Sequence, residues 1–225
     1  MESFEQENDY LALLMHDKIQ IKHPILGRPI NLYRIIAKKT FNVLGHTVER
    51  YEIGGWAQSI KNFDPDKVSW LFNGSRIFDS AYLSDSVLFD SAIAYGNCKI
   101  YSSKCINNSR TYGDCVVINS NLKGLCDIYG SCKVTKSIVT NSVKVFGNAI
   151  VNDSKLSVGA SVFENAKVNS SIVTDICVIR GTADISNCNY SGRVIKESGS
   201  YANETLDVYV KLNIEEALDE EALRA

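Results

Sequence analysis

The chain has 225 residues, of which 45% are hydrophobic and 22% are charged, and its formal net charge is −2. This composition is that of an ordinary folded protein, and no apolar run is long enough to span a bilayer. A protein that binds nucleic acid normally carries a marked basic excess, so the charge balance argues against that class.

The first ten residues, MESFEQENDY, are acidic and unlike the basic head of a secretory signal peptide. We therefore expect a cytoplasmic protein with no membrane partner. Secretion by a leaderless route would leave no trace in the sequence and stays open.

Residues 1–68 are expected to form a cap on the region that follows. A capping box predicts a helix over residues 3–16. The segments 30–41 and 46–53 have the composition of strands joined by a Leu-Gly turn. A helix and a β-hairpin here would cover the first coil of a solenoid, whose bare end exposes strand edges and core.

A strict 17-residue period governs residues 69–195. Serine occupies one position in successive repeats, and cysteine takes the eighth place: Ser69, Ser86, Ser103, Ser120, Ser137, Ser154, Ser171 and Cys188. Self-similarity at a fixed period over more than half of a chain predicts a solenoid.

Each repeat has three mostly aliphatic columns, and a column of small residues stands two positions before each. Side chains at i and i+2 of a strand share a face, so each coil should hold three short strands with both columns inward. The predicted fold is all-β: a single-stranded triangular β-helix of 17-residue coils with a small N-terminal α/β cap. A strand and a short helix are expected at the C-terminal end.

The cysteines and the serine column are predicted to fill the interior. All seven thiols fall in inward columns: Cys98, Cys105, Cys115, Cys126, Cys132, Cys177 and Cys188. None has the C-x-x-C spacing of a metal site, so we expect buried reduced thiols, no metal and no cofactor. The serine hydroxyls should form hydrogen bonds within the stack rather than act as nucleophiles.

One outward column is aromatic and follows the first aliphatic column. Its members are Phe78, Tyr95, Tyr112, Tyr129, Phe146 and Phe163. They should stack as a ladder beside a turn, which stabilises the sheet. Because Tyr and Phe are enriched in interface cores, the ladder is also our candidate binding strip.

Apolar side chains also gather at outward positions of the first coils. The candidate oligomer contact consists of Trp70, Tyr82, Val87, Phe89 and Ile93. So much exposed apolar surface is unusual for a monomer, and we expect a dimer or a trimer. A protein partner is possible at the same surface.

Residues 196–225 carry 3 Lys/Arg against 8 Asp/Glu. The segment 206–214 alternates like a strand, and an acidic helix is predicted over 213–223. A terminal cap or an oligomer contact would explain both elements.

The entry segment 32–83 resembles that of the YdcK-like hexapeptide-repeat proteins. The residues that match are Tyr33, Arg34, Ile35, Ala37, Phe41, Gly54, Gly55, Trp56 and Trp70. With the repeats, the resemblance covers about 160 residues. It implies a left-handed coil and a family often named as transferases without a settled chemistry. The regular 17-residue coil and the acidic tail depart from that family.

Three functions follow from these patterns. The main hypothesis is a non-enzymatic β-solenoid scaffold or protein-interaction module that self-associates. The alternatives are a hexapeptide-repeat acyltransferase that uses acyl-CoA and a filament-forming protein resembling bactofilins. The only histidines are His16, His23 and His46, all before the solenoid, so no coil turn supplies a histidine general base. No catalytic residue is assigned.

A basic patch for nucleic acid is not expected. Lys99, Lys104 and Arg110 fall on three different faces of one coil and would form a ring instead.

Overall fold

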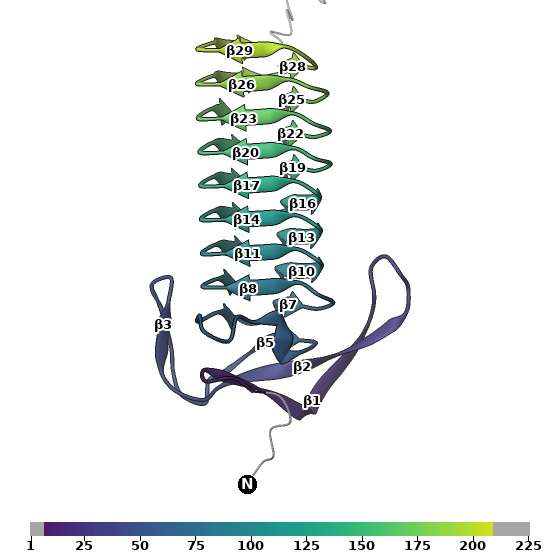
Figure 1. Cartoon of the computed structure of the whole chain (residues 1–225), viewed down its shortest axis with the longest axis vertical. Coiled ribbons are helices and arrows are strands. Elements are labelled where there is room, and N and C mark those ends of the chain that lie inside the picture. Colours follow the sequence, from purple (N-terminus) through teal and green to yellow (C-terminus); the bar gives the residue numbers. More distant parts are fainter. Residues whose placement is uncertain (1–6, 209–225) are drawn as a thin grey trace, which may run out of the picture.

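The computed structural model describes residues 7–208 and contains, within them, strands and one short 3-10 helix, η1 (Ile60–Asn62). Three sheets of stacked strands run along the long axis of the molecule (Figure 1). None of the described helices is long or apolar enough to cross a bilayer.

Each sheet collects one strand from successive coils. Sheet 1 contains β1 (Leu11–Lys22), β2 (Pro29–Ala37), β5 (Ile53–Ala57), β7 (Arg76–Ile77), β10 (Ile93–Gly96), β13 (Arg110–Gly113), β16 (Asp127–Gly130), β19 (Lys144–Val145), β22 (Ser161–Val162), β25 (Val178–Ile179) and β28 (Ile195–Lys196). Sheet 2 contains β8 (Tyr82–Ser84), β11 (Lys99–Tyr101), β14 (Val116–Ile118), β17 (Lys133–Thr135), β20 (Ile150–Asn152), β23 (Lys167–Asn169), β26 (Asp184–Ser186) and β29 (Ser200–Ala202). Sheet 3 contains β6 (Trp70–Leu71), β9 (Val87–Leu88), β12 (Lys104–Ile106), β15 (Asn121–Lys123), β18 (Ile138–Thr140), β21 (Lys155–Ser157), β24 (Ile172–Val173), β27 (Asn189–Gly192) and β30 (Thr205–Val208).

The predicted stack of parallel coils is confirmed. Ile100 pairs with Leu83 in the coil before and with Val117 in the coil after, each 17 residues away. Sheet 3 has nine strands, one from each turn, so the solenoid has about nine turns. The aliphatic and small columns point inward and are buried along the whole stack, as with Cys115 and Val117 on β14.

The serine column closes the turn between sheets 2 and 3. The hydroxyl of Ser120 donates to the carbonyl of Ile118 at 2.8 Å and accepts from the backbone N–H of Ser137 at 3.1 Å. The same pair of bonds recurs from Ser86 to Ser171. Each hydroxyl thus satisfies a buried N–H of the next coil, which would otherwise be costly to bury.

The N-terminal cap is built from strands, and the expected helix over residues 3–16 is wrong where the structure describes it. Residues 11–22 form β1, which pairs antiparallel with β2, and β2 pairs antiparallel with β5. From Met15 to Lys22 the side chains alternate between half-buried and exposed, as in a strand with one covered face. Pairing along sheet 1 and burial of Leu11–Leu14 outweigh the local helix signal, because helical propensity is a weak prior.

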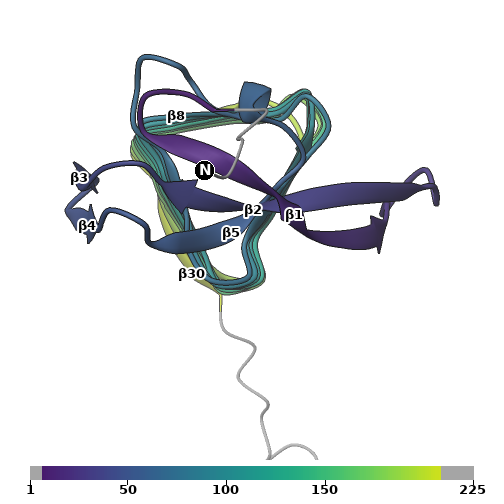
Figure 2. The same ribbon diagram turned by 90° about the horizontal axis from the view of Figure 1, so that it is seen from below.

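A second hairpin leaves the cap along sheet 3. Its strands β3 (Phe41–Val43) and β4 (His46–Val48) are joined at Leu44 and Gly45, whose φ angles are 47° and 81°. This confirms the predicted turn, whereas the strand expected over 30–41 ends at Ala37 as β2. The β1–β2 and β3–β4 hairpins project on opposite sides of the solenoid (Figure 2).

At the other end, the parallel stack continues beyond residue 195. β29 pairs with β26, and β30 pairs with β27, both in parallel. β30 covers the start of the strand expected over 206–214. The remainder of that strand and the helix expected over 213–223 lie outside the described residues.

Val158 is the one β-branched residue in the left-handed region of the described chain, with φ 52°. The same place in neighbouring coils holds Asn141 and Asp175, residue types that tolerate this conformation. We expect Val158→Asn to raise the free energy of unfolding by about 1 kcal/mol and the melting temperature by about 2–4 °C. Val158 is half exposed, so little burial is lost. Thermal denaturation of the two proteins checks this, and a lower melting temperature of the variant would refute it.

Candidate binding surface

The aromatic column stacks as predicted. Neighbouring ring centroids are 4.7–5.0 Å apart from Phe78 to Phe163, and the ring planes are within 11° of parallel. The rings stand at the turn between sheets 1 and 2. Phe78 and Tyr95 are buried, whereas the next four rings are partly exposed. Burial raises the pKa of Tyr112 to about 12.

The stacking restricts what the ladder can bind. Between Tyr95 and Phe146 each ring has a neighbour on both faces, so it offers solvent only its edge and, in the tyrosines, its hydroxyl. Ligands that stack on ring faces, such as sugars and nucleobases, find no free face along these coils. The ladder is suited to side-on apolar contact with another protein surface.

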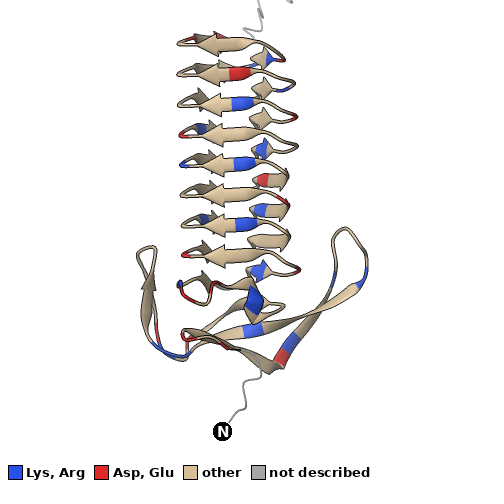
Figure 3. Cartoon of the chain, in the orientation of Figure 1, with Lys and Arg blue, Asp and Glu red and all other residues tan. Residues whose placement is uncertain are grey.

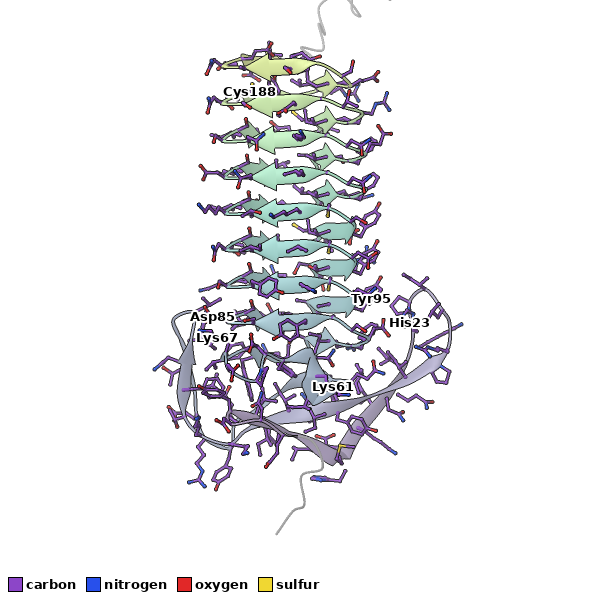
Figure 4. The ribbon with its side chains drawn as sticks, in the orientation of Figure 1. His23, Lys61, Lys67, Asp85, Tyr95 and Cys188 are labelled. Atoms are coloured by element: carbon purple, nitrogen blue, oxygen red, sulfur yellow. The ribbon has the colours of Figure 1, made fainter. Side chains whose placement is uncertain are left out.

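The tip of the β1–β2 hairpin folds back onto the base of the ladder. His23 is buried there, and its ring lies edge-on to Phe78 and Tyr95 at 5.7 and 5.9 Å. Beneath them, Ile30, Leu32 and the two ladder rings belong to one apolar cluster. The hairpin and the first coils therefore form one packed unit (Figure 4).

Hydrogen bonds fix the hairpin tip on the solenoid. Nε2 of His23 lies 2.9 Å from a carboxylate oxygen of Asp79, and that same oxygen accepts the backbone N–H of Gly96 at 3.1 Å. Nδ1 of His23 accepts the backbone N–H groups of Ile25 and Leu26 at 3.1 and 2.9 Å. Nδ1 must therefore be unprotonated, and Nε2 carries the proton that bonds to Asp79.

The same bonds present two aliphatic side chains to solvent. Ile25 and Leu26 are 68% and 62% exposed. Together with Tyr95 and Gly96 they line an open groove of about 490 Å³. We call Ile25, Leu26 and the partly exposed ladder rings Tyr112, Tyr129, Phe146 and Phe163 the ladder strip.

The histidines do not form a general-base site in the described structure. Both ring nitrogens of His23 are occupied, so it holds the hairpin instead of accepting a substrate proton. His46 lies on the other hairpin, where Nε2 is 3.5 Å from Nζ of Lys104 and the ring packs 4.8 Å from that of Phe89. His16 is exposed on β1.

The thiols lie in the interior. All seven are buried and reduced. Desolvation raises the pKa of Cys105 to about 12, and the pKa of Cys126 and Cys177 is raised by the same cause. A buried protonated thiol is a poor nucleophile and a poor metal ligand. Across residues 7–208, no three His, Cys, Asp or Glu side chains are grouped so as to hold a metal ion.

Two residues of the candidate oligomer contact are not on the surface. Trp70 and Val87 are fully buried, so the expected exposure is wrong for both. The β3–β4 hairpin explains Trp70, whose ring meets that of Phe41 at 5.7 Å. Tyr82, Phe89 and Ile93 are half-buried. Much of the outward apolar surface of the first coils is thus buried by contacts within the same chain.

The basic residues are distributed as the sequence predicted. Lys99, Lys104 and Arg110 lie on β11, β12 and β13, one in each sheet. Figure 3 shows blue and red positions spread along the whole stack. Arg110 is bonded to Asp127 in the next coil at 2.6 and 2.7 Å, which neutralises it.

Sequence reasoning missed the His23–Asp79 contact and the hairpin tip. A signal was present, since residues 15–22 (MHDKIQIK) alternate with period two and a Pro-Ile-Leu-Gly turn follows His23. If residues 11–22 and 30–37 had been predicted as the two strands of one hairpin, the length of these strands would have placed the hairpin tip beyond the edge of a coil. Contact with Asp79 depends on the direction in which the hairpin bends, which the pattern does not encode.

Comparison with known proteins identifies no family. No protein-family model matches the chain, and no curated protein matches it. Among solved structures, a "putative acetyltransferase" of Bacillus cereus is similar, with 16% identical residues and coverage of 72% of this chain and 88% of that chain. The TM-score is 0.23, so this likeness carries no argument about function.

Proposed function

We propose that the protein is a non-enzymatic β-solenoid interaction module that self-associates through the ladder strip. The observation that carries the proposal is the hairpin tip, where His23 holds Ile25 and Leu26 exposed beside the ladder. An aliphatic pair fixed in this way gains from contact with another apolar surface, because little chain entropy remains to be lost on binding.

A second copy of the chain is the partner that fits this strip. A two-fold interface uses the same patch on both subunits, so the patch must contain both halves of each contact. The ladder strip does so, since it holds projecting aliphatic side chains and, next to them, half-exposed ring edges. We include in this proposal that the coils are triangular and left-handed, as expected from the sequence. Coils of that shape would keep the ladder strip straight.

The first test replaces the projecting side chains. Ile25→Ser with Leu26→Ser is expected to weaken the dimer by about 10⁴-fold, because a two-fold interface buries four of these side chains and each contributes about 1.5 kcal/mol. Sedimentation equilibrium over a concentration series measures the dissociation constant. The matched control is Ile53→Ser with Ile195→Ser, at positions that are 58% and 61% exposed and away from the strip.

Two outcomes would contradict the proposal. If the wild-type protein stays monomeric throughout the concentration series, self-association is refuted. If the strip and control variants weaken the dimer equally, the interface does not lie at the ladder strip. The acyltransferase alternative makes a separate prediction, namely that acetyl-CoA raises the melting temperature by binding the native state. The interaction module predicts no such rise.

A further inference from the structure

The outer surface of sheet 3 is basic and apolar above the β3–β4 hairpin. Register places Ile138, Lys155 and Ile172 in one outward column on successive coils. Ile138 and Ile172 are 48% and 45% exposed. Lys123 and Lys155 are exposed as well, and neither forms an ion pair with any residue of the described chain.

The adjoining turn between sheets 3 and 1 extends this surface. Leu125, Val158 and Ile176 are between 49% and 62% exposed there. Lys136 and Lys155 line a shallow groove of about 270 Å³ together with Ile138, Ile172 and one carboxylate, that of Asp153. We call Lys123, Ile138, Lys155 and Ile172 the sheet 3 patch. It combines uncovered aliphatic side chains with unneutralised positive charge.

The chain itself contains a segment of complementary composition. Residues 209–225 include five carboxylates, Glu215, Glu216, Asp219, Glu220 and Glu221, against two basic residues, Lys211 and Arg224. Aliphatic residues stand between and around the carboxylates, as at Leu218 and Leu223. The segment follows directly on β30, the terminal strand of sheet 3.

The distances allow contact within one molecule. β21 and β15 lie three and five coils from β30 in the strand order, which at about 4.8 Å per coil is roughly 14 and 24 Å. Glu215 and Glu221 are 7 and 13 residues beyond Val208, and an extended chain spans about 3.3 Å per residue, so they can reach roughly 23 and 43 Å.

Sheet 2 also bears lysines, and it is less accessible from β30. Sheet 2 carries Lys99, Lys133 and Lys167 at outward positions, and Lys167 is paired with Asp184 at 3.9 Å. In Figure 2, β8 of sheet 2 lies along the upper side of the solenoid, and β30 lies at its lower left. A segment that starts at Val208 meets the sheet 3 patch before it can pass around to sheet 2.

We propose that residues 209–225 bind to the sheet 3 patch of the same molecule. Their carboxylates pair with Lys123 and Lys155, and their aliphatic side chains cover Ile138 and Ile172. The contact is independent of the ladder strip, which lies at the turn between sheets 1 and 2. It closes the apolar surface of sheet 3 to other proteins, as the β3–β4 hairpin does for the lower coils.

Zero-length carbodiimide cross-linking of the full chain tests the contact, because it joins a lysine to a carboxylate only when the two are in contact. We expect cross-links from Lys123 and Lys155 to residues 215–221, at about tenfold the yield from Lys99 and Lys133. A mixture of ¹⁴N- and ¹⁵N-labelled protein, analysed by mass spectrometry, shows whether each cross-link lies within one copy. Equal yields from both sheets, or cross-links mainly between copies, would overturn the proposal.

A second variant tests the apolar half of the contact and leaves the lysines in place. Ile138→Ser with Ile172→Ser is expected to reduce the cross-link yield from Lys155 about tenfold, since the aliphatic contact is lost. The matched control is Ile150→Ser on sheet 2, which is 37% exposed. All three side chains are on the surface, so the fold is retained. An unchanged yield in the double variant would show that charge alone draws the segment and would refute the binding mode.

Discussion

Raising the pH from about 8.5 to about 10.5 is expected to unfold the protein, because five interior thiols have raised pKa values. The group consists of Cys105, Cys115, Cys126, Cys132 and Cys177. A thiol is neutral when protonated, so desolvation favours the protonated form, and it raises the pKa of Cys105 from 9.0 to about 12. In the unfolded chain the same thiols ionise from about pH 9 upward.

The sign of the effect follows from proton binding. Above about pH 9 the unfolded chain holds fewer thiol protons than the native protein, so the free energy of unfolding falls as the pH rises. The stabilisation is fully present when the pH is below the pKa of the thiols in the unfolded chain. It is lost as the pH rises toward their pKa in the native protein. Cys105, whose pKa in the native protein is about 12, contributes about 2 kcal/mol over this interval, and the other four thiols act in the same direction. A loss of this size from several thiols is a large part of the stability of a typical domain.

Circular dichroism across the alkaline range measures this transition, and Ellman's reagent should label the thiols only as it occurs. A control uses the chain's own substitutions: the column of Cys115 and Cys132 holds Ala149 and Ala166 in later coils. Cys115→Ala with Cys132→Ala removes two ionisable groups and should move the alkaline midpoint upward. A midpoint that stays unchanged would show that other groups cause the unfolding.

The solenoid could be predicted because every coil repeats the same pattern of inward residues. One coil with Cys115, Val117 and Ser120 at their spacing would be an ambiguous short strand. Stacking in register is the arrangement that buries every copy of the pattern at once. The 17-residue pairing of Ile100 with Val117 could therefore be predicted, and so could the hydrogen bond of each serine with the next coil.

The cap lacks such repetition, and sequence reasoning was weakest there. The first half of β1, up to His16, was expected to be helical, because one local signal was not checked by a second copy of the pattern. Trp70 and Val87 occupy outward positions of the repeat, yet both are buried, and Phe41 of the cap packs on Trp70. The ladder strip could likewise be predicted only in part. The stacking of Tyr95 on Tyr112 follows from the 17-residue period, whereas the contact of His23 with Asp79 depends on how the β1–β2 hairpin bends.

The Gly-Gly-Trp motif has a structural explanation at the junction of cap and solenoid. β5 pairs antiparallel with β2 of the cap and parallel with β7 of the first coil. On β2, Arg34 stands opposite Trp56, with its guanidinium 4.1 Å from the ring centroid and a bond of 2.9 Å to the carbonyl of Gly54. The motif that carries the resemblance to the YdcK-like proteins is thus explained here as a joint between two parts of the fold.

Gly55→Ala is expected to lower the free energy of unfolding by about 3 kcal/mol or more and the melting temperature by roughly 6–12 °C. An added Cβ would lie 2.5 Å from the carbonyl oxygen of Ser75 and 2.9 Å from Cβ of Leu71. The carbonyl is held by the sheet, because the N–H of Trp56 donates to it at 2.9 Å. Neither atom can make room for the added Cβ unless the first coil moves away from the cap.

Thermal denaturation measures the loss, with Gly45→Asn in the β3–β4 turn as the control. Gly45 has a positive φ of 81° that asparagine tolerates, and no atom lies within 4 Å of an added Cβ. Coils of a solenoid contact only their neighbours, so hydrogen exchange of Gly55→Ala should rise first in β1, β2 and β5 and least in the distant β26. Equal melting temperatures of the two variants, or exchange that rises evenly along the stack, would show that the joint does not hold the cap in place.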